Sequence, residues 1–122
     1  MESKYKSRKV INEDGVFDSR KEYKRWRELK LLEQAGKIED LERQVRIELI
    51  PAIREPDKVG KRGGVIKGKV IERKVSYTAD FRYYDPEIAD YVYEDVKGVR
   101  TKDYILKRKI LMWRYGIRIK ET

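Results

Sequence analysis

The sequence predicts an α/β protein in which a mixed β-sheet is flanked by two helices and preceded by a small N-terminal hairpin. Three segments alternate apolar and polar residues with the period of a strand, and two others repeat apolar residues with the period of a helix. No internal repeat and no second domain are evident in the 122 residues, which suffice for one modest core. Residues 1–122 are therefore expected to form a single domain with the order α-β-β-β-α-β after the hairpin.

The first third of the chain is expected to hold a basic arm, the hairpin and the first helix. Residues 1–9 are polar and basic, which is typical of a mobile arm. Asp14-Gly15 separates two short apolar pairs, at 10–11 and 16–17, and predicts the hairpin. Asp18-Ser19 opens a helix that ends near Ala35, followed by the stop residue Gly36. The apolar side of this helix is expected to comprise Tyr23, Trp26, Leu29 and Leu32, with Leu31 and Ala35 alongside.

The rest of the chain is expected to form three strands, a second helix and a short last strand. A basic, glycine-rich connection at 55–69 separates the first two strands and is interpreted as a loop. Gly116 ends the second helix, whose inward side is expected to present Leu106, Ile110 and Trp113. The predicted strands are 45–50, about 70–83, about 90–97 and 117–119, and the predicted helix is 102 to about 115.

Composition points to a polyanionic partner. Charged residues make up 43% of the chain and the net charge is +9, so nucleic acid is the first candidate. Disorder is not expected, because the apolar residues are periodic and aromatic residues are plentiful. The absence of Cys and His excludes thiolate and imidazole metal sites, Ser-His-Asp triads and HNH-type nuclease sites. No apolar run is long enough for a signal peptide or a membrane span, so a soluble, cytoplasmic protein is expected.

Two charged strand segments form the most informative pattern. Period-2 alternation puts Asp95 and Lys97 side by side on one face of the third strand, and Asp80 lies on the preceding strand. Two carboxylates suit Mg²⁺, which binds one or two of them together with water and substrate phosphate. A neighbouring lysine is able to orient an attacking water. The competing interpretation is a solvated Asp–Lys salt bridge with no chemical role.

Two glutamates lie next to this constellation. Alternation puts Glu94 on the face opposite Asp95 and Lys97, and we interpret it as a salt-bridged supporting residue. Glu22 lies on the first helix, where it is either a third acid at the site or the acid of a capping box with Ser19. The local pattern alone favours the cap.

Two groups of cations are candidates for contact with DNA. The glycine-rich connection has no acidic residue between Lys58 and Lys69, which favours contact with phosphate over a merely solvated loop. The cations around the second helix follow the Asp-x-Lys strand, and they either flank a scissile phosphate or form a solvated face. The first group is Lys58, Lys61, Arg62, Lys67 and Lys69, and the second is Arg100, Lys102, Lys107, Arg108 and Lys109.

Several motifs together resemble a known family. They are the stretches DGVFDSRKE at 14–22, LKLL at 29–32, GKI at 36–38, LERQ at 41–44, YTADF at 77–81 and VYEDVKG at 92–98. Over nearly its whole length the chain resembles the small phage-encoded, Holliday junction resolvase-like endonucleases of the PD-(D/E)xK nuclease superfamily. The connection at 55–69 departs from the family in being longer and richer in glycine and lysine.

The resemblance implies a restriction-endonuclease-like αβββαβ core and a divalent metal, Mg²⁺ with Mn²⁺ able to substitute. It carries over Asp80, Asp95 and Lys97 as catalytic residues and Glu22 as the acid of the first helix, with Gln44 near the site. The resulting hypothesis is an endonuclease for branched DNA that leaves 5′-phosphate ends, works as a homodimer and uses the Val96 carbonyl as a further metal ligand. A nuclease for flaps, mismatches or plain duplex, or a non-enzymatic nucleic-acid-binding protein, remains the alternative.

Overall fold

The structure is a computed structural model that describes residues 8–122. Most of the predicted basic arm at 1–9 lies outside the described residues. Two helices and ten strands make up the described part. In chain order they are β1 (Val10–Asn12), β2 (Gly15–Phe17), α1 (Arg20–Gln34), β3 (Glu39–Ile50), β4 (Ile53–Arg54), β5 (Lys58–Val59), β6 (Val65–Ile66), β7 (Val70–Glu72), β8 (Val75–Asp85), β9 (Asp90–Asp95), α2 (Lys102–Tyr115) and β10 (Ile119–Glu121).

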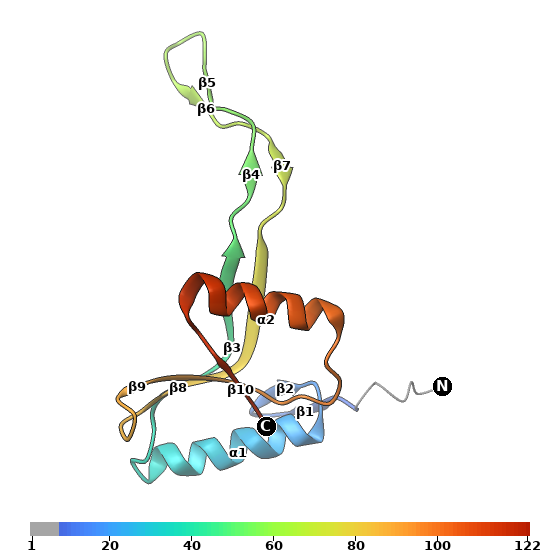
Figure 1. The fold of residues 1–122 in the computed structure, drawn as a ribbon, viewed down its shortest axis with the longest axis vertical. Helices are drawn as coiled ribbons and strands as arrows, with labels where there is room; N and C mark the ends of the chain where they lie inside the picture. Colours follow the sequence, from blue (N-terminus) through green and yellow to red (C-terminus); the bar gives the residue numbers. More distant parts are fainter. Residues whose placement is uncertain (1–7) are drawn as a thin grey trace.

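A four-stranded mixed sheet with the order β10-β9-β8-β3 forms the centre of the molecule. β3, β8 and β9 pair antiparallel, whereas β10 pairs parallel to β9 after the crossover through α2. Figure 1 shows α2 beside the β3–β8 hairpin and α1 beneath the end of the sheet where β8 and β9 pair. A mixed α/β protein with a mixed sheet, two helices and a small N-terminal β1–β2 hairpin is therefore confirmed.

Two apolar clusters hold the helices against the sheet. The cluster at α2 contains Leu49, Tyr77, Ala79, Tyr104, Leu111 and Ile119. The cluster at α1 contains Leu29, Ile38, Phe81 and Tyr83, with Trp26 packed against it. Buried residues of β8 thus change from the α2 cluster to the α1 cluster between Ala79 and Phe81, with Asp80 at the changeover.

β3, which pairs with β8, is irregular opposite Asp80. β3 has a register shift between Glu39 and Glu42, and Gln44 has φ of 51° although it is not a glycine. Its neighbours Arg43 and Val45 pair with Phe81 and Ala79, so Gln44 lies opposite Asp80. The strand begins at Glu39 and not at the predicted residue 45. The prediction missed its first half because an irregular residue interrupts the alternation of apolar and polar side chains.

The caps of both helices agree with the sequence. Ser19 and Thr101 are the N-caps, and each hydroxyl accepts a hydrogen bond of 3.1 Å from the amide three residues on. Gly116 ends α2 in the left-handed conformation with φ of 68°, and its amide donates to the Met112 carbonyl.

The predicted inward side of α2 is wrong except at Ile110. Leu106 is 58% exposed and Trp113 is 84% exposed, whereas Tyr104 and Leu111 are buried. Both pairs are seven residues apart, so either produces an apolar stripe. The two stripes are offset by two residues, about 200° around the helix, and the sequence pattern does not choose between them.

Three further boundaries differ from the prediction. β9 ends at Asp95, so Lys97 lies just beyond the strand and not within it. The last strand is Ile119–Glu121, two residues later than expected. At the end of α1, Leu31 is 65% exposed and Leu32 is 37% exposed, so the apolar side of this helix is shorter than expected.

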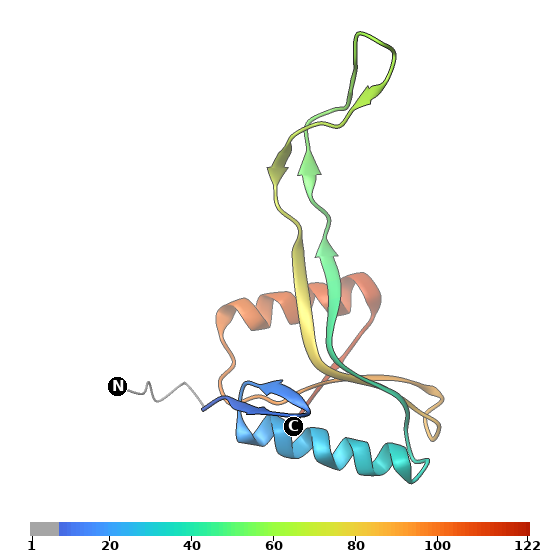
Figure 2. The same ribbon diagram turned by 180° about the vertical axis from the view of Figure 1, so that it is seen from behind.

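Residues 51–74, here called the arm, form a long hairpin, and the predicted loop at 55–69 contains the two short paired strands β5 and β6. The ribbon continues the β3–β8 hairpin through the pairs β4–β7 and β5–β6. Figures 1 and 2 show it projecting away from both helices. Glycines hid these strands from the sequence analysis. At Gly68, for example, a Cβ atom would lie 1.7 Å from the Glu55 carbonyl oxygen, so the crossing of the two chains requires glycine.

No helix within residues 8–122 is long and apolar enough to cross a membrane.

Candidate active site

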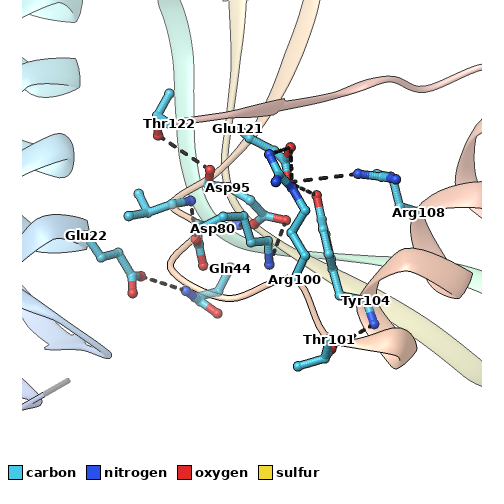
Figure 3. A network of polar contacts seen from close by, with 12 residues as sticks. Glu22, Gln44, Asp80, Asp95, Arg100, Thr101, Tyr104, Arg108, Glu121 and Thr122 are labelled. Carbon is cyan, nitrogen blue, oxygen red and sulfur yellow. Dashed lines mark hydrogen bonds and ion pairs between the residues drawn. The ribbon is translucent and has the colours of Figure 1, made fainter. Parts of the chain in front are cut away.

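Asp80 and Asp95 lie opposite each other on β8 and β9. Each carboxylate is held by a backbone amide of the other segment: the Asp80 amide donates to Asp95 Oδ1 at 2.8 Å, and the Val96 amide donates to Asp80 Oδ2 at 2.9 Å. These contacts occupy one oxygen of each side chain (Figure 3). The register of the two strands therefore fixes the relative position of the two acids.

Lys97 completes the predicted constellation. Its Nζ lies 3.5 Å from Asp95 Oδ2 and 3.9 Å from the centre of the Tyr104 ring. The Tyr104 hydroxyl donates to Glu121 at 2.9 Å, and burial raises the pKa of Tyr104 to about 12. Glu121 in turn accepts three hydrogen bonds from Arg100. The lysine is thus placed by an aromatic ring that α2 and β10 hold in position.

Glu22 reaches the same region from the first turn of α1. Its Oε1 accepts a hydrogen bond of 3.2 Å from the Gln44 side chain and lies 3.8 Å from the Arg43 guanidinium. Burial, followed by the negative charge of Asp80, raises the pKa of Glu22 to about 7. A row of polar side chains therefore runs from α1 through β3 and β8 to β9: Glu22, Gln44, Asp80 and Asp95 (Figure 3).

The capping interpretation of Glu22 is correct in part. The Ser19 hydroxyl accepts a hydrogen bond from the Glu22 amide, as a capping box requires. The Glu22 carboxylate accepts a hydrogen bond of 3.1 Å from the Asp18 amide, whereas the motif predicts one from the Ser19 amide. The side chain thus folds back one residue further than expected. Because only Oε2 takes part in this contact, Oε1 is left to face Gln44.

The backbone at Gln44 is strained. A positive φ in a side-chain-bearing residue costs about 1 kcal/mol or more, and it persists only where the surroundings impose it. Here the strain brings a side-chain amide between the carboxylate of α1 and that of β8. Gln44 was expected at the start of a strand, and its positive φ has no signal in the sequence.

The residues of the row fit a hard divalent cation. Burial raises the pKa of both Asp80 and Asp95, against the lowering by backbone amides and Lys97, so positive charge supplied between them would stabilise the site. Asp95 Oδ2 is buried and makes no hydrogen bond, although the Lys97 ammonium lies 3.5 Å from it. Within residues 8–122 no three acidic side chains converge to form a ready metal cage. The donor set therefore resembles that of Mg²⁺, which completes its shell with water and phosphate.

Glu94 points away from this row, as alternation predicted. Its side chain is fully buried, and it accepts hydrogen bonds from Arg25 of α1 and from the Tyr83 hydroxyl at 2.7 Å. Glu94 is accordingly a salt-bridged residue that ties β9 to α1.

The cations predicted to contact DNA fall into two groups with different surroundings. Around α2, Arg100 and Arg108 pair with Glu121, and Lys107 pairs with Asp103. Lys102 and Lys109 lie on the same helix without an ion pair among the described residues. The five cations of the predicted loop lie on the arm, away from the row of carboxylates.

Four residues that support the site were missed by the sequence analysis: Arg25, Arg43, Tyr104 and Glu121. Each acts through contacts between segments far apart in the chain. Arg43 illustrates the problem, because its guanidinium lies 3.7 Å from the Phe17 ring centre and donates to the Val16 carbonyl as well as approaching Glu22. Only Tyr104 had a local signal, since it lies three residues after the Thr101 cap and on the same side of α2 as Leu111, seven residues later.

Comparing Glu22→Gln with Ser19→Ala separates the two roles of this helix start. A carboxyl whose pKa is raised from 4.5 to about 7 by folding stabilises the folded state below pH 4.5, and this contribution is lost as pH rises toward 7. In chelator, wild-type protein should therefore lose stability relative to Glu22→Gln between pH 5 and 8. Ser19→Ala should lower the free energy of unfolding by about 1 kcal/mol at pH 5 and at pH 8 alike. Urea unfolding measures both, and a wild-type-minus-Gln difference that is flat with pH would contradict the buried-acid assignment.

The chain matches one protein family over residues 2–121, described as "Protein of unknown function (DUF1064)". Searches of curated proteins and of solved structures found no match. Because the match spans nearly the entire sequence, the chain belongs to the DUF1064 family.

Proposed function

We propose that this protein is a divalent-metal-dependent DNA endonuclease with a restriction-endonuclease-like PD-(D/E)xK core. The observation that supports this best is the Asp80–Asp95 pair, fixed by reciprocal backbone hydrogen bonds on adjacent strands with Lys97 beside it. The element order α1-β3-β8-β9-α2-β10 agrees with the proposed core once the arm is set aside. The net charge of +9 suits a polyanionic substrate.

Asp80, Asp95 and the Val96 carbonyl are the proposed metal ligands, and Glu22 would hold a metal-bound water or a second ion. Mg²⁺, or Mn²⁺ in its place, would supply Lewis acidity at a non-bridging phosphate oxygen. Lys97 would orient the attacking water and offset charge that builds on the phosphate. Tyr104 would keep the ammonium at the carboxylates.

Branched DNA is the proposed substrate, cut to leave 5′-phosphate ends in the cytoplasm of the cell in which the protein is made. Resolution of a four-way junction requires two symmetric cuts, so a two-fold homodimer belongs to this proposal. The exposed side chains of Trp113 and Leu106 on α2 offer apolar surface for such a contact. A nuclease for flaps, mismatches or duplex would use the same residues with a different substrate preference.

The test is cleavage of end-labelled junction and of linear duplex of equal length. We expect cutting in Mg²⁺ or Mn²⁺ and none in chelator. We also expect preference for the junction, because two of its duplex branches reach the two active sites of the dimer at once. Light scattering should give twice the chain mass for the free protein, and two chains plus one junction for the complex. Equal cutting of both substrates by a monomer would remove junction resolution from the proposal, and binding without cutting in either metal would leave a non-enzymatic DNA-binding protein.

A further inference from the structure

Hydrogen bonds join the two chains of the arm from its base to the turn at its tip. The Glu55 amide donates to the Lys69 carbonyl at 2.8 Å, and near the tip the Gly60 amide donates to the Gly64 carbonyl at 2.7 Å. Side chains reinforce the middle of the arm, where Asp57 accepts the Gly68 amide and Arg54 donates to the Gly68 carbonyl. A two-stranded ribbon is only marginally stable alone in water. We therefore infer that these hydrogen bonds maintain a defined hairpin that packs against no other part of the described protein.

The charge of the arm is strongly positive. Residues 51–74 hold eight cations and three acids, an excess of five. One of the acids, Asp57, is engaged inside the ribbon with the Gly68 amide. Five cations at and near the tip make no ion pair with any residue that the structure describes: Lys58, Lys61, Arg62, Lys67 and Lys69. These five charges are available to phosphates.

Apolar side chains lie between these cations. Val59 is 79% exposed, Val65 is 74% exposed and Ile66 is 56% exposed. No part of the described protein covers them. A narrow surface with aliphatic side chains flanked by cations is complementary to a groove of duplex DNA, whose walls are phosphates and whose floor offers base edges and thymine methyl groups.

The dimensions of the ribbon select the groove. Two strands about 5 Å apart, with their side chains, fit the major groove of about 12 Å but not the minor groove of about 6 Å. The major groove of double-stranded RNA is too deep and narrow for side chains to read. Association of one arm with the arm of a second copy is opposed by the excess of five positive charges on each.

We propose that the arm lies in the major groove of duplex DNA on one side of the cutting site, an inference that rests on the proposed action on DNA. The ribbon leaves the sheet at residue 51 and turns near residue 60, so its tip reaches roughly 30 Å from the sheet at about 3.3 Å per residue. This distance is close to one helical turn of DNA, about 34–36 Å. The carboxylates lie seven residues further along β3, because Asp80 is opposite Gln44, so the tip contacts the duplex between about one and one and a half turns from the phosphate that is cut.

The first test compares two double substitutions that remove the same charge. Lys61→Gln/Arg62→Gln neutralises the tip, whereas Lys30→Gln/Lys37→Gln neutralises two cations at the C-terminal end of α1, the opposite side of the molecule from the arm. Affinity for a labelled 30-base-pair duplex is measured across a range of salt concentrations in Ca²⁺, so that cutting is blocked. The tip variant should lower the slope of log K against log salt by about 2, and the control should leave it unchanged.

The second test locates the arm on the DNA. Methylation of guanine N7, which blocks the major groove, should interfere with wild-type binding about one to one and a half helical turns from the cut, and this interference should vanish in the tip variant. Val59→Ser/Val65→Ser should weaken binding several-fold without changing the salt slope, since no charge is removed. Double-stranded RNA should compete poorly.

The outcomes separate this inference from the proposed activity. Tip and control variants with equal salt slopes, or interference only by minor-groove ligands, would overturn the major-groove assignment even if the protein cuts DNA. A tip variant that loses oligomer mass in light scattering while keeping its DNA affinity would make the arm a protein–protein contact. If instead the wild-type protein shows the arm-dependent slope but never cuts, the groove contact holds and the nuclease proposal fails.

Discussion

Replacing Asp95 with asparagine is expected to abolish DNA cutting while the protein still folds and binds DNA. Asparagine keeps the oxygen that accepts the Asp80 amide, so the β8–β9 geometry is retained, but the charge beside Lys97 is gone. If Asp95 is a metal ligand as proposed, its loss removes several kcal/mol of transition-state stabilisation, and about 4 kcal/mol corresponds to roughly a thousandfold in rate. Asp80→Asn should have the same effect, because the Val96 amide can still donate to the side-chain oxygen.

Asp90→Asn is the matched control for this experiment. Asp90 is an exposed acid on the same strand and is paired with Asp85, away from the row of carboxylates. Single-turnover cutting of junction DNA should be unchanged in this variant, and circular dichroism should be the same for all three proteins. Wild-type cutting by Asp95→Asn would disprove the assignment of the site.

The largest expected effect on stability comes from Arg25→Ala. Arg25 is the charged partner of Glu94, whose side chain is fully buried, so removing the guanidinium leaves an uncompensated carboxylate inside the protein. Breaking a buried pair in this way costs about 3–5 kcal/mol, and the lower end is expected because the Tyr83 hydroxyl still donates to Glu94. This is a large part of the free energy of unfolding of a typical small protein, which is roughly 5–15 kcal/mol.

A double substitution shows whether the charge is the cause. Arg25→Ala/Glu94→Gln should recover part of the lost stability in urea unfolding, because the buried group is then neutral. Lys107→Ala, which breaks the exposed pair with Asp103 on α2, should cost about 0.5 kcal/mol or less. Equal losses for Arg25→Ala and Lys107→Ala would show that the buried pair does not hold β9 to α1.

The sequence predicted the parts of this fold that depend on local signals. Ser19 and Gly116 mark helix ends through hydrogen bonds within a few residues, and both were predicted correctly. Alternation along β9 separated Asp95 from Glu94, because a strand's side-chain period holds wherever the strand is regular. Juxtaposition of Asp80 with Asp95 followed from that regularity and from the short turn between the two strands.

The parts that were missed depend on irregular backbone and on contacts across the fold. At Gln44 a positive φ breaks the period of β3, so neither the start of the strand nor the role of its bend was visible. In α2 two stripes share one spacing, and only packing against Tyr77 and Ile119 selects Tyr104 and Leu111 over Leu106 and Trp113. Glycines made the arm look like a loop, although they are what allows its two chains to cross closely.

The short parallel pairing of β10 with β9 makes residues 95–97 the part of the candidate site that opens locally most readily. Beyond Asp95, the segment is tied to β10 by two backbone hydrogen bonds, from Thr122 to the Asp95 carbonyl and from Lys97 to the Thr122 carbonyl. β10 is an edge strand of three residues, and elements of that kind detach at much lower free energy than the whole protein unfolds. Fraying of this edge would release Lys97 while Asp80 and Glu22 stayed in place. Any ligand that bridges the carboxylates and the lysine would then bind the closed form alone and hold the edge strand on the sheet.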